Sequence, residues 1–205
     1  MLDGLQIPMS QLFALLAAVG FAAGLNVYAT VGVLGLLARF GHMPLPPGLQ
    51  VLEHWGVIAA CAVMFVIEFF ADKVPAFDLI WNALQTFVRV PVAAFIGYRA
   101  ASQLSPEHQL LAALVGAGVA FAAHGGKTAI RAAVTPSPEP VSNIALSLGE
   151  DASAIGLTWL ATRHPYVAGT AAIIAVVITV FLARLVVKAV RTFFQTSENV
   201  LTGAA

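Results

Sequence analysis

Ionisable and amide side chains recur at helical spacing inside otherwise apolar stretches of the chain. Each set follows the period of an α-helix, so its members share one face of that helix. The sets are Asp78, Asn82, Gln85 and Arg89; His124, Lys127, Thr128 and Arg131; and Asn143, Ser147, Glu150 and Asp151. Glu68 and Asp72 stand four residues apart at the end of another apolar stretch, and Lys73 follows them. These residue types could bind ions, carry protons or hold a charged headgroup.

Charges at membrane depth are costly, on the order of 2.5 to 3.5 kcal/mol each on insertion scales, so they normally face the protein interior and have partners. The acids are Glu68, Asp72, Asp78, Glu150 and Asp151, and the bases are Lys73, Arg89, Lys127 and Arg131. The near balance predicts one shared cluster. Candidate residues of an ion or substrate pathway are Glu68, Asp72, Lys73, Asp78, Asn82, Arg89, His124, Lys127, Arg131, Asn143, Ser147, Glu150 and Asp151.

Some polar residues have a simpler interpretation as interhelical packing contacts. We expect this for Asn26, Thr30, Ser147 and Thr128, whose side chains can hydrogen-bond across helices. For His124, a hydrogen-bonded core histidine and a functional one both stay open. Close helix packing is expected at Gly20, Gly24, Gly116 and Gly118.

The composition is that of a membrane protein. The 205 residues are 60% hydrophobic and only 10% charged, whereas a soluble domain carries about 25% charged residues. Mean hydropathy is +0.89. Ten bases against ten acids leave no strongly basic surface for nucleic acid. The lone Cys61 excludes an intrachain disulfide and a cysteine metal site, and no motif indicates a cofactor.

Six stretches are candidate membrane spans, since a helix needs about 20 mainly apolar residues to cross. They are 9–38, 51–70, 78–101, 109–134, 141–162 and 166–190. The first would be about 45 Å long at 1.5 Å per residue, so it must tilt or break near Gly20, Gly24 and Asn26. We therefore predict an all-α, polytopic transmembrane helix bundle with a polar interior, formed by residues 1–205 as one domain.

The distribution of bases predicts the orientation. With six spans, both termini share the side that collects Lys73, Lys127, Arg131, Arg184, Lys188 and Arg191. The other side has Arg39, Arg99 and Arg163. Positive residues concentrate on the cytoplasmic side of membrane proteins, so both termini are expected in the cytoplasm. The last three bases of the larger group are expected to reach lipid headgroups.

Several polar segments carry a family resemblance. They are ADKVPAFD at 71–78, ALQTFVR at 83–89, TPSPEPVSNIALSLGED at 135–151, LLARFG at 36–41 and Gly24-Leu25-Asn26. In these segments, and over nearly its whole length, the chain resembles the bacterial integral-membrane family known as domain of unknown function 4126. The resemblance implies a small multi-span protein, here expected in the bacterial inner membrane, and it implies no activity.

The first functional hypothesis is a transporter or channel-like protein. Arg89, Lys127 and Arg131 would bind an anionic solute or lipid headgroup, because fixed bases at membrane depth attract anions. The carboxylates would carry protons or cations; these are Glu68, Asp72, Glu150 and Asp151. The lipid bilayer is the one partner that composition implies directly, and a homo-oligomer stays open.

Two alternatives come from other classes. An intramembrane enzyme acting on a lipid phosphate could hold Mg²⁺ between carboxylates such as Glu68 and Asp72. Mg²⁺ uses only one or two protein carboxylates, so five acids exceed its need and this hypothesis ranks lower; whether the cluster binds any metal stays open. The second alternative is an assembly factor whose polar faces bind a partner membrane protein.

Overall fold

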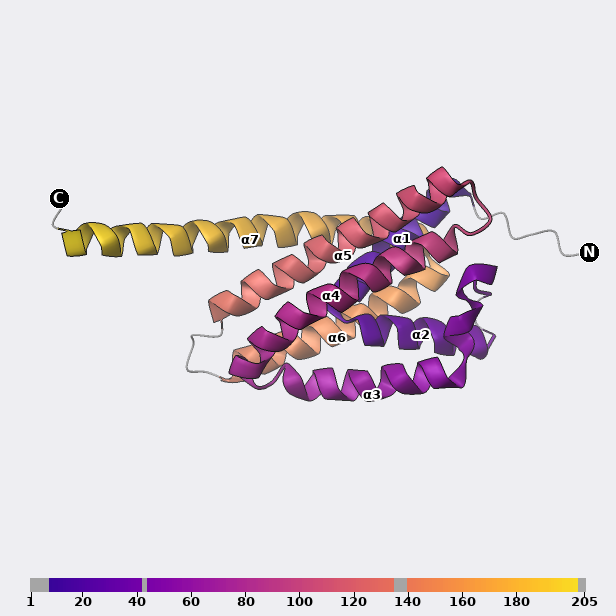
Figure 1. The fold of residues 1–205 in the computed structure, drawn as a ribbon, viewed down its shortest axis with the longest axis horizontal. Coiled ribbons are helices and arrows are strands. Elements are labelled where there is room, and N and C mark those ends of the chain that lie inside the picture. The colour runs from indigo at the N-terminus through magenta and orange to yellow at the C-terminus, as the bar shows by residue number, and fades with distance from the viewer. Residues whose placement is uncertain (1–7, 42–43, 135–139, 203–205) are drawn as a thin grey trace, which may run out of the picture.

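The computed structural model describes residues 8–41, 44–134 and 140–202, and within these ranges the chain is helical with no strand. The elements are α1 (Met9–Leu25), α2 (Val27–Arg39), the short 3-10 helix η1 (Pro47–Glu53), α3 (Trp55–Ala71), α4 (Pro75–Ala100), α5 (Pro106–Val134), α6 (Pro140–Arg163) and α7 (Pro165–Thr202) (Figure 1). Proline occupies the first position of the last four helices, where its missing N–H leaves no hydrogen bond unmade. The all-α prediction is confirmed.

The long first apolar stretch is broken at Asn26, as its length and its Gly and Asn residues predicted. Asn26 has extended backbone angles, φ −150° and ψ 104°, so α1 ends there. The Asn26 side-chain oxygen accepts a hydrogen bond from Ala29 N at 2.9 Å, which caps the N-terminus of α2. One residue therefore ends one helix and begins the next.

The two halves fold back on each other instead of crossing the bundle together. Leu12, near the start of α1, packs in a cluster with Ala101 at the end of α4. Gly35, near the end of α2, lies against the carbonyl of Leu52 in η1, and Gly48 of η1 accepts a hydrogen bond from Arg99 Nε at 3.1 Å. The outer ends of α1 and α2 thus lie at the same end of the bundle, with the break in its interior (Figure 1). Residues 9–38 form a re-entrant pair, not the expected crossing.

This reversal also affects at which ends of the bundle α1 begins and α7 ends. Helix α1 begins at the end of the bundle where α6 passes into α7, and α7 ends beyond the opposite end (Figure 1). The prediction that both termini lie in the cytoplasm counted residues 9–38 as a complete crossing, and it stays a prediction. Asn26 reverses the chain direction inside the bundle, and the start of α1 and the end of α7 lie at opposite ends of the bundle (Figure 1).

Two helical segments of the described chain are long and apolar enough to span a membrane, and six spans are not confirmed. They are Pro106–Ala132 in α5 and Pro165–Ala189 in α7, with a third if η1 and α3, bent by 64°, count as one span. Helices α4 and α6 have sufficient length, but each holds ionisable residues such as Arg89 or Asp151 in its middle. These residues lower the hydropathy of helices that keep their polar face inside.

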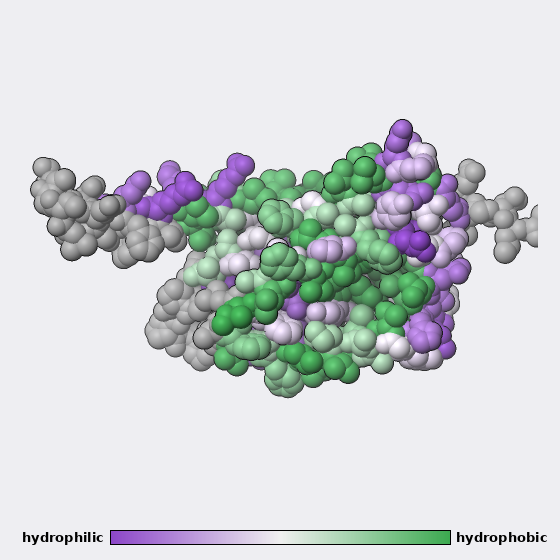
Figure 2. All heavy atoms as spheres, in the orientation of Figure 1, coloured by the Kyte–Doolittle hydropathy of each residue, from purple (hydrophilic) through white to green (hydrophobic). Residues whose placement is uncertain are grey.

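Close packing of α1 against α5 forms the centre of the bundle. A Cβ added at Gly20 would lie 3.0 Å from the Gly116 carbonyl oxygen, and one at Gly24 would lie 2.5 Å from that of Ala120. These glycines let the two backbones approach closely, as expected, whereas Gly118 faces open space and the packing prediction for it is wrong. Figure 2 shows apolar side chains over much of the visible face, with hydrophilic ones at one end and along α7.

Candidate functional site

The last carbonyl groups of α1 end inside the bundle and are bound by basic side chains. Arg89 Nη1, from α4, donates to the Gly24 oxygen at 3.1 Å. Lys127 Nζ, from α5, donates to the Leu25 oxygen at 3.2 Å. A helix C-terminus carries unpaired carbonyls and a partial negative charge. Two basic side chains from other helices therefore donate hydrogen bonds to α1 carbonyl groups that would otherwise be unpaired inside the bundle.

Each of these bases also contacts carboxylates. Arg89 forms an ion pair with Glu68 of α3, and both side chains are fully buried. Lys127 Nζ lies 3.1 Å from Asp72 and 3.1 Å from Glu150. The two basic residues thus connect the α1 terminus to acids from α3, α6 and the connection after α3.

Arg131, one helical turn after Lys127, extends the same group. Its guanidinium binds Glu150 with two nitrogens, at 2.5 and 3.2 Å, and Asp72 Oδ2 at 3.1 Å. This two-pronged contact matches the planar guanidinium to a carboxylate. We call the assembled residues the central charge network; they are Glu68, Asp72, Arg89, Lys127, Arg131 and Glu150.

His124 lies beside the network in neutral form. Arg89 Nη1 approaches His124 Nδ1 at 2.9 Å, and because a guanidinium only donates, Nδ1 must accept. The ring proton is then on Nε2, which donates to the Asn82 carbonyl at 3.0 Å. His124 therefore acts in this structure as a buried support for Arg89, which is the hydrogen-bonded core interpretation of the two that the sequence left open.

Asp151 stands apart from the other buried carboxylates because no base of the described residues forms an ion pair with it. Asn26 Nδ2 donates to Asp151 Oδ1 at 2.8 Å. The second oxygen, Oδ2, is buried and has no hydrogen-bond partner among the described residues, although the residue is only 5% exposed. Ser147, one turn earlier on the same face of α6, has a buried hydroxyl in the same condition. A carboxylate oxygen without a donor is a place for a proton or cation.

The predicted pathway residues fall into three groups. Those that the structure gathers in or beside the central charge network are Glu68, Asp72, Asn82, Arg89, His124, Lys127, Arg131, Ser147, Glu150 and Asp151. Lys73 has no ion pair in the described chain; its ammonium lies 3.0 Å from the Phe69 ring centroid and donates to the Phe69 carbonyl. The side chains of Asp78 and Asn143 lie outside the described residues. The functional roles of all these residues stay predictions.

Asn26 makes the expected interhelical hydrogen bond, to Asp151 of α6, whereas its capping of α2 was not predicted. The available signal was an asparagine in the middle of an apolar stretch too long for one span. Tyr28 was also missed; its hydroxyl accepts from Gln85 Nε2 at 3.2 Å. No periodic pattern marks a single tyrosine as facing the interior.

Within the described part of the chain, no group of three or more His, Cys, Asp or Glu side chains is placed to hold a metal ion. The carboxylate pairs proposed for Mg²⁺ lie instead against guanidinium, ammonium and amide groups.

Comparison with known proteins gives a family and no activity. Residues 13–185 match the family described as a domain of unknown function, DUF4126. No curated protein and no solved structure matches the chain. The matched range includes the α1–α2 break and the whole central charge network. Since the match covers well over half of its length, the chain belongs to the DUF4126 family.

Proposed function

We propose that this protein is a transporter or channel-like protein of the bacterial inner membrane, and that it moves a proton or a monovalent cation. The ion occupies Asp151 beside the α1–α2 break. The observation that carries the proposal is the buried Asp151 carboxylate at the junction of two half-helices, whose Oδ2 has no hydrogen-bond partner among the described residues. The other buried carboxylates have bases in contact.

The broken helix supports transport over a purely structural role. Irregular backbone at membrane depth is tolerated only where protein buries it or where it lines a cavity. In secondary transporters, discontinuous helices place carbonyls and helix ends at the substrate and ion sites. The α1–α2 pair has the same parts, with the Gly24 and Leu25 carbonyls and the α2 N-terminus close to Asn26.

Pairing within the network favours a cation or proton over an anionic solute. Arg89, Lys127 and Arg131 already contact carboxylates, so an anion would have to displace one of them. Asp151 has the opposite character, because its one hydrogen-bond donor among the described residues is the neutral amide of Asn26. The nearby Lys73 places its ammonium against the Phe69 ring. A small positive species would complete the site.

Ion flux into proteoliposomes tests this proposal. Vesicles loaded with a pH-sensitive dye, or with a dye sensitive to the alkali cation under test, are exposed to gradients of H⁺, Na⁺, K⁺ or Li⁺, with empty liposomes as background. We expect flux of one of these ions with the wild-type protein. Asp151→Asn keeps the shape of the side chain and removes its charge, and should lower the rate at least tenfold. The matched control is Glu107→Gln, which neutralises an exposed carboxylate at the start of α5 and should keep the full rate.

Three results would contradict the proposal. Flux of all four ions at the background rate would contradict the proposed transport of protons and alkali cations. A wild-type rate in Asp151→Asn, with an unchanged helical spectrum in detergent, would exclude Asp151 as the ion-binding site. Flux that follows chloride or phosphate, and is lost in Arg89→Gln, would assign the site to the bases.

A further inference from the structure

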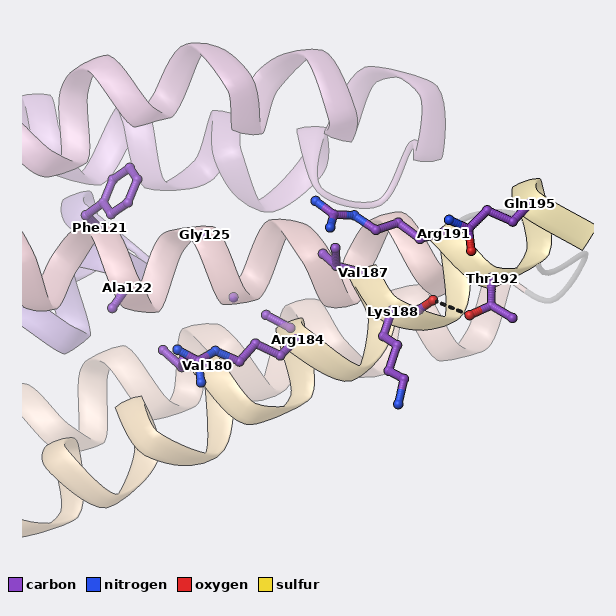
Figure 3. A pocket seen from close by; sticks show the side chains of 12 residues that line it. Phe121, Ala122, Gly125, Val180, Arg184, Val187, Lys188, Arg191, Thr192 and Gln195 are labelled. Carbon is purple, nitrogen blue, oxygen red and sulfur yellow. Dashed lines mark hydrogen bonds between the residues drawn. The ribbon is translucent and has the colours of Figure 1, made fainter.

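A cleft opens between α5 and α7, away from the central charge network. Its volume is about 690 Å³, which lies within the range of small-molecule sites, roughly 300 to 1,000 Å³. Phe121 and Ala122 of α5 and Val180 of α7 line one end of it (Figure 3). Gly125 lies on the cleft wall between the two helices, and a Cβ added there would meet no atom within 4 Å. This part of the cleft is an apolar surface with free space.

The other part of the cleft is basic. Arg184, Lys188 and Arg191 line it from α7, and the described residues that line the cleft include no acid (Figure 3). Within the described chain these three side chains form no ion pair, and all three are at least partly accessible. A negatively charged occupant would complement these bases. It must also bring an apolar part, because the same cleft continues over Phe121 and Val180.

We propose that this cleft binds one anionic phospholipid from the surrounding bilayer. Its phosphate lies among Arg184, Lys188 and Arg191, and the upper part of an acyl chain lies over Phe121 and Gly125. Basic pockets between membrane helices are suited to such headgroups. A free phosphate would leave the apolar wall uncovered, and a neutral lipid would leave the bases without a partner. The proposal is independent of ion transport, because no lining side chain of the cleft forms an ion pair with the central charge network in the described part of the chain.

The family match adds a further distinction. It ends at residue 185, so Lys188 and Arg191 lie beyond the shared region while Arg184 and the α5 wall lie within it. The cleft is therefore assembled from a family element and from the end of α7 that follows it in this chain.

Lipid binding to the purified protein tests the proposal directly. The probe is phosphatidylglycerol with a fluorescent acyl chain, titrated in detergent, with the matching phosphatidylcholine and inorganic phosphate as competitors. We expect saturable binding of the anionic lipid, at least tenfold tighter than that of phosphatidylcholine. The combined variant Arg184→Gln, Lys188→Gln and Arg191→Gln should lose at least tenfold in affinity. Arg163→Gln, which removes an exposed base at the end of α6, should leave binding unchanged.

A second variant tests the apolar wall without changing any charge. Gly125→Leu fills the free space and should weaken phosphatidylglycerol binding several-fold. Gly118→Leu is the matched control, because Gly118 lies on the same helix, also faces open space and does not line the cleft. Both substitutions replace a helical glycine by leucine, so their effects on the helix itself are alike.

Several outcomes would overturn the proposal. Equal affinity for both lipids would show that the headgroup charge does not contribute to binding. Full competition by inorganic phosphate, at an affinity like that of the lipid, would show that the cleft binds small anions and not a lipid. A loss in the triple variant with no change in Gly125→Leu reduces the interaction to general surface attraction. A cross-link between Gly125→Cys residues of two copies, present without lipid, would show that a second chain covers this surface.

Discussion

The central charge network and the basic end of α7 use the same residue types in opposite ways. In the network, Arg89 and Arg131 are fully buried, and each contacts a carboxylate from another helix. In the α5–α7 cleft, Arg184 and Lys188 line an open surface on which the structure describes no acid. The first arrangement holds helices together, and the second leaves charges available.

The difference follows from the cost of desolvation. A buried guanidinium without a partner is strongly unfavourable, and removing one member of a buried pair leaves the other uncompensated. An exposed base keeps its hydration or reaches a headgroup and needs no fixed partner. Substitutions of similar chemistry in the two regions should therefore change the free energy of unfolding by very different amounts.

The largest effect is expected where a buried pair is broken. Arg89→Met removes the partner of Glu68 and the donor to the Gly24 carbonyl, so the free energy of unfolding should fall by about 3 to 5 kcal/mol. The measurement is an unfolding titration in mixed detergent micelles. The double variant with Glu68→Met should recover part of the loss, because no unpaired charge remains. Additive losses in the double variant would show that the two residues do not interact.

A smaller effect is expected at the helix break. Asn26→Ala removes both the cap of α2 and the hydrogen bond to Asp151, and loss of a cap costs about 0.5 to 2 kcal/mol. Asn26→Ser retains a capping oxygen and should lose less stability in the same titration. Equal stability of both variants and the wild type would mean that this residue does not hold the break.

The smallest effect is expected at the end of α7. The triple variant Arg184→Gln, Lys188→Gln and Arg191→Gln should change the free energy of unfolding by no more than about 0.5 kcal/mol, as surface substitutions usually do. The unfolding titration is carried out without anionic lipid, so that lipid binding does not contribute. A loss of unfolding free energy as large as that of Arg89→Met would show that the bases at the end of α7 stabilise the fold as much as the buried ones do.

Much of the fold could be predicted because its signals are local. The apolar composition, the helical spacing of Asn82, Gln85 and Arg89, and the excessive length of the first apolar stretch are all readable along the chain. These signals correctly indicated helices, a buried face on each of them and a break at Asn26. They did not indicate the direction taken after the break, because a change of chain direction depends on what the next helix packs against.

The chain's composition and periodicity by themselves determined that this is an all-helical, apolar protein with polar faces turned inward. Only the tertiary structure decided that α1 and α2 re-enter, that the acids and bases of α3 to α6 pair around the α1 terminus, and that Asp151 has an amide for its partner. The Asn26–Asp151 hydrogen bond joins residues 125 positions apart. Helical periodicity places a side chain on a face, but the depth and rotation of one helix relative to another decide which faces meet.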